Sequence, residues 1–357
     1  MQAIIEQYQA IIRAAADNQT PLQIRGGGTK HFYGNAPAQQ PAAFFDTTAY
    51  HGIVDYEPTE LVLTARAGTR LADVEALLAE HGQMLAFEPP HFGAAATLGG
   101  CIAAGLSGPR RATAGAVRDF VLGLRLLDGT GKDLRFGGQV MKNVAGYDVS
   151  RLMAGAMGTL GVILEVSLKV LPKPPAEVTL RLAMSEAAAI EQMNQWAGKP
   201  LPVSATCHAD GELLVRLSGA ESTVRAAQIK LGGEVLPDSA AFWQSIREQT
   251  HGFFQSGQPL WRLSVRSTAA PLALPGKQLL EWNGGLRWLS GGDGLDVETI
   301  RQWAKDAGGH ATLFRNLTSQ LPVFHPLEPA LMAIHRSLKQ QFDPAGIFNR
   351  GRLYPDL

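Results

Sequence analysis

The sequence of 357 residues contains little cysteine and no excess of either charge. Its two cysteines, Cys101 and Cys207, are too few to hold an iron-sulfur cluster, and neither lies in a C-x-x-C pair that would indicate zinc or dithiol chemistry. Lys and Arg together number 32, as do Asp and Glu, so composition gives no general reason to expect binding to nucleic acid or to an anionic membrane. A small molecule or another protein is the expected partner.

The sequence also lacks a long apolar run. No stretch approaches the roughly 18 uninterrupted apolar residues that a membrane-spanning helix needs. Residues 1–19 are predicted to form an amphipathic helix, without the basic start and the cleavage site of a secretory signal. We therefore expect a cytoplasmic protein with no transmembrane segment, and attachment to the inner face of the cell membrane through a complex stays open. Trp243, Phe253 and Phe254 are expected to be exposed and available for docking.

Glycine, in contrast, is abundant, with 39 residues. A predicted strand at residues 22–25 leads directly into Gly26, Gly27 and Gly28, and a second segment poor in large side chains covers residues 97–107. Successive glycines expose backbone N–H groups with no Cβ in the way, so a diphosphate can approach closely. The first cluster matches neither the dinucleotide fingerprint nor the P-loop. A turn without a ligand explains it equally well, so this cluster alone decides nothing.

Prolines at 172, 174 and 175 mark the expected domain boundary. Beyond them, two rounds of short strands and a helix predict an α+β layer, and a last helix is predicted at residues 327–342.

Four motifs carry a family resemblance when they are taken in order. RGGGT from Arg25, EPPHFGAAATLGG from Glu88, GLSGPRR from Gly105 and GAMGTLGV from Gly155 resemble the FAD-binding fold shared by vanillyl-alcohol oxidase and p-cresol methylhydroxylase (PCMH). With DPAGIFNRGR near the end, the chain is similar nearly throughout to the smaller FAD-binding subunits of glycolate oxidases. The resemblance implies an α+β protein. A PCMH-type FAD-binding domain of two subdomains is expected at 1–173, a smaller α+β cap domain at 176–325, and a C-terminal segment that packs back on the FAD domain at 326–357.

The same resemblance implies where FAD binds. The Gly26 loop and a loop at 97–107 are expected to meet at the FAD diphosphate from opposite sides, with the main chain of Val162 near the adenine or flavin ring. The expected cofactor-binding residues are Arg25, Gly26, Gly27, Gly28, Thr29, Pro90, Thr97, Leu98, Gly99, Gly100, Gly105, Ser107, Gly158, Gly161, Val162 and Asn349. For Leu98, core packing is an equally weighted alternative. Arg350 replaces the proline of the family's terminal motif.

Relatives that tether the flavin covalently often place a histidine directly after the first glycine loop. Thr29 occupies that position here, and His31 lies two residues further on. We therefore expect noncovalent FAD.

Catalytic residues are less clearly marked. Related hydroxy-acid dehydrogenases carry metal-ligating histidines in the cap, whereas this chain has CHADGELLVRL, in which His208 is expected on a strand and Asp210 in a hairpin turn, so no metal is expected. Arginine suits a carboxylate substrate, and Arg110, Arg111 and Arg262 are the candidates, with Arg262 taken as catalytic. His310 is the candidate proton acceptor. A solvated or phosphate-facing arginine and a strand histidine remain the alternatives.

The function implied by the resemblance is that of an FAD-binding subunit that oxidises glycolate, or a similar small 2-hydroxy acid, to the 2-oxo acid. Its implied partners are a larger FAD-binding subunit and an iron-sulfur subunit, and activity is expected only in that complex. Two alternatives stay open. The chain could be a structural or electron-relay subunit that binds FAD without contacting substrate, or a separate reductase that uses a nicotinamide cofactor.

Overall fold

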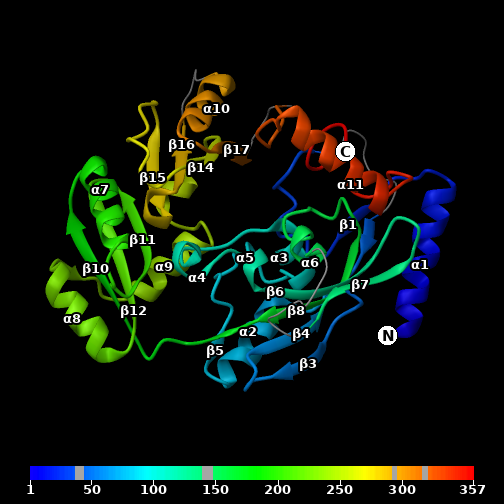
Figure 1. Ribbon diagram of the computed structural model, residues 1–357, viewed down its shortest axis with the longest axis horizontal. Helices are drawn as coiled ribbons and strands as arrows, with labels where there is room; N and C mark the ends of the chain where they lie inside the picture. Colours follow the sequence, from blue (N-terminus) through cyan, green and yellow to red (C-terminus); the bar gives the residue numbers. More distant parts are fainter. Residues whose placement is uncertain (37–43, 139–147, 292–295, 316–320) are drawn as a thin grey trace.

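The computed structural model describes residues 1–36, 44–138, 148–291, 296–315 and 321–357. Two antiparallel sheets dominate it, and Figure 1 shows them side by side, with the N-terminal and C-terminal helices on the same side of the molecule. Within the described residues the α+β class expected from the sequence is confirmed, because each sheet carries its own helices.

The first sheet has five strands in the order β3-β4-β8-β6-β7. Two small sheets lie beside it, one of parallel strands β1 and β2 and one of antiparallel strands β5 and β9. The bounds are β1 Gln23–Arg25, β2 Phe44–Asp46, β3 Ile53–Glu57, β4 Val62–Arg66, β5 Gln83–Met84, β6 Val121–Leu127, β7 Asp133–Gly137, β8 Val162–Lys169 and β9 Leu171–Pro172. Strand β8 is buried along most of its length because it pairs with a strand on each side.

The helices of this part are mostly short. Their bounds are α1 Gln2–Asp17, α2 Leu71–Glu80, α3 Leu98–Ala104, α4 Arg111–Ala114, α5 Val117–Phe120 and α6 Val149–Leu152. The predicted loop at 97–107 is therefore wrong for its first part, which is helix α3. Thr97 caps this helix by accepting a hydrogen bond from the Gly100 N–H at 3.3 Å, and Gly105 ends it with a φ of 67°.

The second sheet has eight antiparallel strands in the order β13-β10-β12-β11-β15-β16-β14-β17. Its elements are β10 Ala176–Ala183, α7 Glu186–Ala197, β11 Val203–Ala209, β12 Glu212–Gly219, α8 Glu221–Leu231, β13 Glu234–Val235, α9 Ser239–Arg247, η1 Gly252–Gln255, β14 Leu260–Ser264, β15 Lys277–Glu281, η2 Trp282–Gly284, β16 Leu286–Ser290, α10 Val297–Asp306 and β17 His310–Arg315. This sheet with its helices is called the cap below. The predicted boundary at 173–176 falls between β9 and β10.

The two faces of the cap sheet differ. Helices α7, α8 and α10 cover one face with apolar contacts. Because side chains alternate along a strand, Trp261 and Leu263 of β14 join that core while Arg262 between them points to the opposite face. That opposite face packs against the first part of the chain and holds the polar residues of the candidate site.

Trp243, Phe253 and Phe254 are buried, so their predicted exposure is wrong. They lie in the core between the cap sheet and the first part of the chain. The indole N–H of Trp243 donates to the Thr179 hydroxyl at 2.8 Å, which satisfies its one polar group inside that core.

The chain finally returns to its beginning. Helix α11, Pro329–Phe342, places the Lys339 ammonium 2.9 Å from the Thr159 carbonyl oxygen. Leu22 and Phe348 then form a parallel bridge, which brings the C-terminal tail beside β1. Residues from both ends of the sequence therefore line one region.

Candidate functional site

A cavity of about 640 Å³ lies where the glycine loop, helix α3 and the C-terminal tail meet. This volume is in the range of sites for cofactor-sized ligands. The lining residues are Pro21, Leu22, Gln23, Ile24, Arg25, Gly26, Gly27, Gly28, Thr29, Lys30, His31, Thr97, Gly100, Ala103, Ala104, Met157, Asn349, Arg350, Gly351, Arg352 and Pro355.

The glycine loop touches the segment before α3. A Cβ on Gly27 would overlap the carbonyl oxygen of Ala95, and a Cβ on Gly26 would overlap the Thr97 hydroxyl. The two segments can approach this closely only without side chains at these positions. Gly28 has a φ of 71°, which favours glycine for a second reason. Residues of both segments line the same cavity, and their contact with an FAD diphosphate stays a prediction.

The cavity is electropositive. Its charged lining residues are Arg25, Lys30, Arg350 and Arg352, and no Asp or Glu lines it among the described residues. Arg352 donates to backbone carbonyls at 31, 33 and 35 and has no carboxylate partner there. None of these four cations forms an ion pair with a carboxylate of the described residues, and together with the glycine N–H groups they suit a diphosphate.

Half of the predicted cofactor-binding residues line this cavity. They are Arg25, Gly26, Gly27, Gly28, Thr29, Thr97, Gly100 and Asn349. The Asn349 side chain accepts from the Ile24 N–H at 2.8 Å and donates to the Met157 carbonyl at 2.6 Å, so it joins the tail to β1.

The other predicted residues lie around the cavity or away from it. Leu98 and Val162 are fully buried in apolar cores, and Gly99 packs against Ala67. Gly105 and Gly161 lie close to the backbone of Gly155 and Leu127, respectively, and Gly158 lies close to the side-chain amide of Asn349. Pro90 and Ser107 line a second, smaller cavity. Ligand contact by all these residues stays a prediction.

Several lining residues were missed from the sequence, notably Lys30, His31, Met157 and Arg352. The sequence contained one signal for the residues of the tail, the run Arg350-Gly351-Arg352. Closely spaced arginines beside a glycine suit the binding of an anion. Only the return of the tail to β1 shows which anion site they join.

The second cavity has a volume of about 30 Å³ and lies between the first part of the chain and the cap. Arg262 and Glu281 of the cap line it, opposite Pro90 and Ser107. A space of this size holds about two water molecules. Arg262 and His310 therefore lie outside the larger cavity.

Arg262 and His310 lie on neighbouring strands, because β14 and β17 pair with Ser264 opposite His310. Burial lowers the pKa of His310 to about 4, and the positive charge of Arg262 adds to this effect. His310 is therefore neutral at pH 7 and has ring nitrogens without a hydrogen-bond partner among the described residues. A neutral imidazole can accept a proton.

Glu281 is a buried carboxyl that the sequence did not single out. Its Oε1 accepts a hydrogen bond from the Trp288 indole at 2.8 Å. Burial raises its pKa to about 7, although the Trp288 hydrogen bond and Arg262 act in the opposite direction. A carboxyl that titrates near neutral pH at the edge of a cavity is a candidate acid or base.

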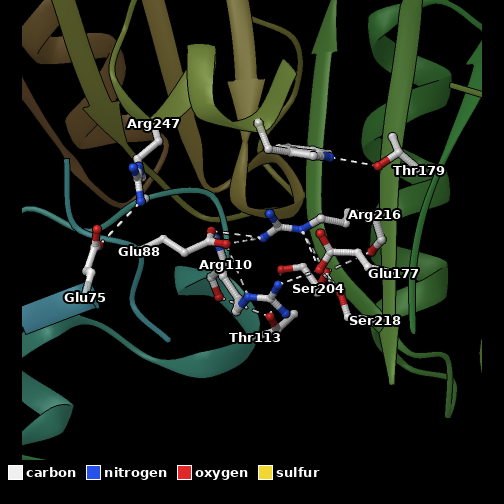
Figure 2. A network of polar contacts seen from close by, with 12 residues as sticks. Glu75, Glu88, Arg110, Thr113, Glu177, Thr179, Ser204, Arg216, Ser218 and Arg247 are labelled. Atoms are coloured by element: carbon white, nitrogen blue, oxygen red, sulfur yellow. Dashed lines mark hydrogen bonds and ion pairs between the residues drawn. The ribbon is translucent and has the colours of Figure 1, made fainter. Parts of the chain in front are cut away.

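Ion pairs join the cap to the first part of the chain, as Figure 2 shows. Glu88 accepts from the backbone N–H of Arg110 at 2.8 Å and pairs with Arg216 of β12 at 2.9 Å. Arg110 also pairs with Glu177 of β10 at 2.8 Å. Arg110 is therefore a structural arginine and is not available to hold a substrate.

A second set of contacts comes from the last residue of α9 and the residue that follows it. Glu248 accepts the backbone N–H groups of His91 and Phe92 at 3.0 and 2.9 Å, and Arg247 lies 3.5 Å from Glu75. These contacts hold the segment after Glu88 against the cap. Together the two sets fix the small cavity in a closed arrangement.

The expected hairpin in CHADGELLVRL is present, with β11 and β12 joined at Asp210 and Gly211. His208 lies on β11, where its Nε2 is 3.0 Å from the Met184 carbonyl oxygen. Among the described residues, no cluster of three or more His, Cys, Asp or Glu side chains is arranged to hold a metal ion.

Within the described part of the chain, no helix has the length and apolar character to cross a membrane.

Comparison with known proteins decides the family. An FAD binding domain model matches residues 3–137. Glycolate oxidase subunit GlcE of Escherichia coli (strain K12) is 48% identical over 356 residues, which cover 100% of this chain and 98% of that protein. This chain belongs to the GlcE family. The resemblance inferred from the glycine motifs is confirmed, and FAD is the cofactor of the matched domain.

Two further relatives match about half of the chain. Glycolate oxidase subunit GlcD of Bacillus subtilis (strain 168) is 30% identical over 51% of this chain and 38% of its own length. The D-lactate dehydrogenase of Archaeoglobus fulgidus is 32% identical over 47% of this chain and 37% of its own length. A solved structure of alkyldihydroxyacetonephosphate synthase has a TM-score of 0.63 at 15% identity and covers 96% of this chain and 73% of its own. That match supports the PCMH-type fold of this member of the GlcE family, and the fold alone.

Proposed function

We propose that this chain is the FAD-binding subunit of a glycolate oxidase complex and takes part in the oxidation of glycolate, or a similar small 2-hydroxy acid, to the 2-oxo acid. The observation that carries the proposal is the 48% identity to glycolate oxidase subunit GlcE along the whole chain. The electropositive cavity beside the glycine loop is the second support, because its residues fit an FAD diphosphate.

In the proposed site, the N–H groups of the glycine loop and the four cations of the large cavity hold the diphosphate. When bound, FAD supplies the acceptor for the electrons of the hydroxy acid. Arg262 holds the substrate carboxylate through its planar guanidinium, and His310 accepts the hydroxyl proton at a ring nitrogen. We propose that residues 1–173, 176–325 and 326–357 act as FAD-binding domain, cap and returning tail.

The partners in this proposal are a larger FAD-binding subunit and an iron-sulfur subunit. The two cysteines, Cys101 and Cys207, are free and buried, so this chain offers no cluster site to pass single electrons onward. The complex would be cytoplasmic, with peripheral attachment to the inner face of the membrane.

The test compares the assembled complex with and without this chain. The complete complex should reduce an artificial acceptor with glycolate, and the isolated chain should bind FAD but be bleached slowly by glycolate under anaerobic conditions. Full glycolate oxidation by a complex that lacks this chain would overturn the proposal.

A second candidate function is an electron-relay or structural subunit whose FAD does not meet substrate. The closed cap favours it, since Arg262 borders a cavity of only about 30 Å³ and not the large one. In that case an Arg262→Ala complex keeps the wild-type KM for glycolate, whereas the first proposal expects a clear rise.

A further inference from the structure

Two arginines from different parts of the chain meet at one tryptophan. The guanidinium carbon of Arg111 lies 4.3 Å from the ring centroid of Trp282, and that of Arg262 lies 5.1 Å from it. Arg111 begins α4 in the FAD-binding part, whereas Arg262 is central in β14 of the cap. The indole N–H of Trp282 donates to the Gly108 carbonyl at 3.0 Å and fixes the ring across the boundary.

Neither guanidinium has a hydrogen bond or an ion pair with any described residue. The neighbouring arginines differ, since Arg110 and Arg216 both pair with Glu88. A guanidinium carries five N–H donors, and leaving them unpaired in a half-buried position costs free energy. Contact with the indole compensates for only a part of this cost.

Each of the two arginines has one acidic neighbour and no ion pair with it among the described residues. For Arg111 this neighbour is Asp119, whose carboxylate accepts the Ala116 N–H at 2.8 Å and opposes the effect of the nearby Arg118. Burial lowers the pKa of Arg111, and repulsion from Arg262 lowers it further. Glu281 is the acidic neighbour of Arg262, but its carboxylate is held by Trp288 and its raised pKa leaves it partly protonated near pH 7. His310 is neutral there, and the Tyr33 hydroxyl has no hydrogen-bond partner among the described residues.

The backbone that carries the indole is strained. Trp282 and Asn283 both have positive φ values, 54° and 57°, although neither is glycine. Asn283 is held there by its N–H, which donates to the Thr206 hydroxyl at 2.9 Å. Such strain persists only where the surroundings enforce it, and it occurs most often at functional sites.

We infer that Arg111 and Arg262 form one binding site for a small carboxylate monoanion, with the Trp282 indole as its floor. The inference deepens the proposed function, on which it rests for the identity of the anion as glycolate or its 2-oxo product. Two planar guanidiniums offer paired N–H donors to the two oxygens of a carboxylate. Both arginines and His310 retain exposed surface, so a small anion can reach them from solvent.

The site is assembled from both parts of the molecule, so anion binding would couple the cap to the FAD-binding part. Arg111 is the residue that this inference adds to Arg262. The two guanidiniums repel each other, and a bound anion relieves this repulsion. A site with both arginines should therefore bind a carboxylate more tightly than a site with either arginine alone.

The experiment measures binding of glycolate and glyoxylate to the full-length chain by calorimetry, with ethylene glycol as a probe of similar size that lacks the carboxylate. We expect both anions to bind and ethylene glycol not to bind. Arg111→Gln and Arg262→Gln should each weaken glycolate binding at least 10-fold, and Arg111→Lys should fall between wild type and Arg111→Gln. Arg225→Gln, an exposed change on α8, should leave binding unchanged. Equal glycolate binding by wild type and both Gln variants would overturn the inference.

Thermal unfolding separates an anion site from mere packing on Trp282. Without anion, Arg111→Gln should unfold at a temperature equal to or above wild type, because a repulsive charge is removed. Added glycolate should raise the Tm of wild type and not that of the variant. If the Tm of Arg111→Gln is lower than that of wild type by the same amount with and without glycolate, Arg111 has a packing role only.

The proposed function and this site can fail separately. If the complex binds glycolate without turnover, the proposed function is wrong but the site remains. If an Arg111→Gln complex turns over glycolate normally, the site alone is wrong.

Discussion

Gly27 packs directly against the carbonyl group of Ala95, so that any side chain at position 27 would overlap that oxygen. This contact joins the loop after β1 to the segment that leads into α3, and both line the large cavity. The spacing between the two loops therefore depends on the absence of one Cβ atom.

The first prediction follows from this contact. A Gly27→Ala chain should bind FAD with much lower occupancy, because the displaced loops no longer present their N–H groups together. The measurement is the flavin absorbance per purified chain, with circular dichroism to confirm folding. Gly252→Ala is the matched control, since a Cβ there meets no atom within 4 Å. Wild-type FAD content in a folded Gly27→Ala chain would contradict the prediction.

The second prediction concerns Glu88. Burial raises the pKa of this carboxyl, but Arg216 and Arg110 outweigh burial and hold the pKa below its usual value. Breaking a buried pair leaves arginines uncompensated, so Glu88→Gln should lower the free energy of unfolding by about 3 kcal/mol at pH 7. Denaturant titration measures this change.

Because the folded-state pKa of Glu88 is depressed, its contribution is present above the unfolded pKa and lost as pH falls through the folded one. The difference in the free energy of unfolding between wild type and Glu88→Gln should therefore become smaller as the pH is lowered. Glu328→Gln, which breaks an exposed pair with Lys305, should change nothing measurable. If Glu88→Gln changes the free energy of unfolding no more than Glu328→Gln does, the ion pairs of Glu88 with Arg110 and Arg216 do not stabilise the contact between the cap and the first part of the chain.

Local patterns in the sequence were sufficient for many elements. The helix predicted at 327–342 is present as α11, Pro329–Phe342, and the hairpin turn predicted at Asp210 joins β11 to β12. Helix α3 was missed because its glycines have low helix propensity, which the Thr97 cap and burial in the core override.

Contacts between distant segments were not predictable in the same way. Arg352 joins the glycine loop only because the tail returns to β1, and Arg216 meets Glu88 only because the cap sheet faces that loop. The sequence shows each of these residues as a charge with no partner. Burial of Trp243 likewise depends on the contact between two sheets.

The third prediction is that FAD is bound noncovalently. Thr29 stands where a tethering histidine is expected, and its hydroxyl donates to the His91 carbonyl at 2.7 Å. Acid precipitation of the holoprotein should therefore release all yellow colour into the supernatant. His31 also lines the cavity, so a His31→Ala chain is the control. A yellow wild-type pellet that becomes colourless in His31→Ala would refute the prediction and identify the tether.

The last prediction uses the pKa of Glu281. Burial raises this pKa to about 7, above the roughly 4.3 of an unfolded glutamate. The folded state therefore holds the proton more tightly, and stability is lost as pH rises from about 4.5 through 7. Glu281→Gln keeps an acceptor for the Trp288 indole but cannot ionise.

At pH 8 the Glu281→Gln variant should be more stable than wild type by on the order of 3 kcal/mol, and at pH 5 the two should be nearly equal in stability. Thermal unfolding at both pH values measures the difference, with exposed Glu191→Gln as the control. A variant that is less stable than wild type at pH 8 would mean that the Glu281 carboxylate is needed there as the counter-ion of Arg262.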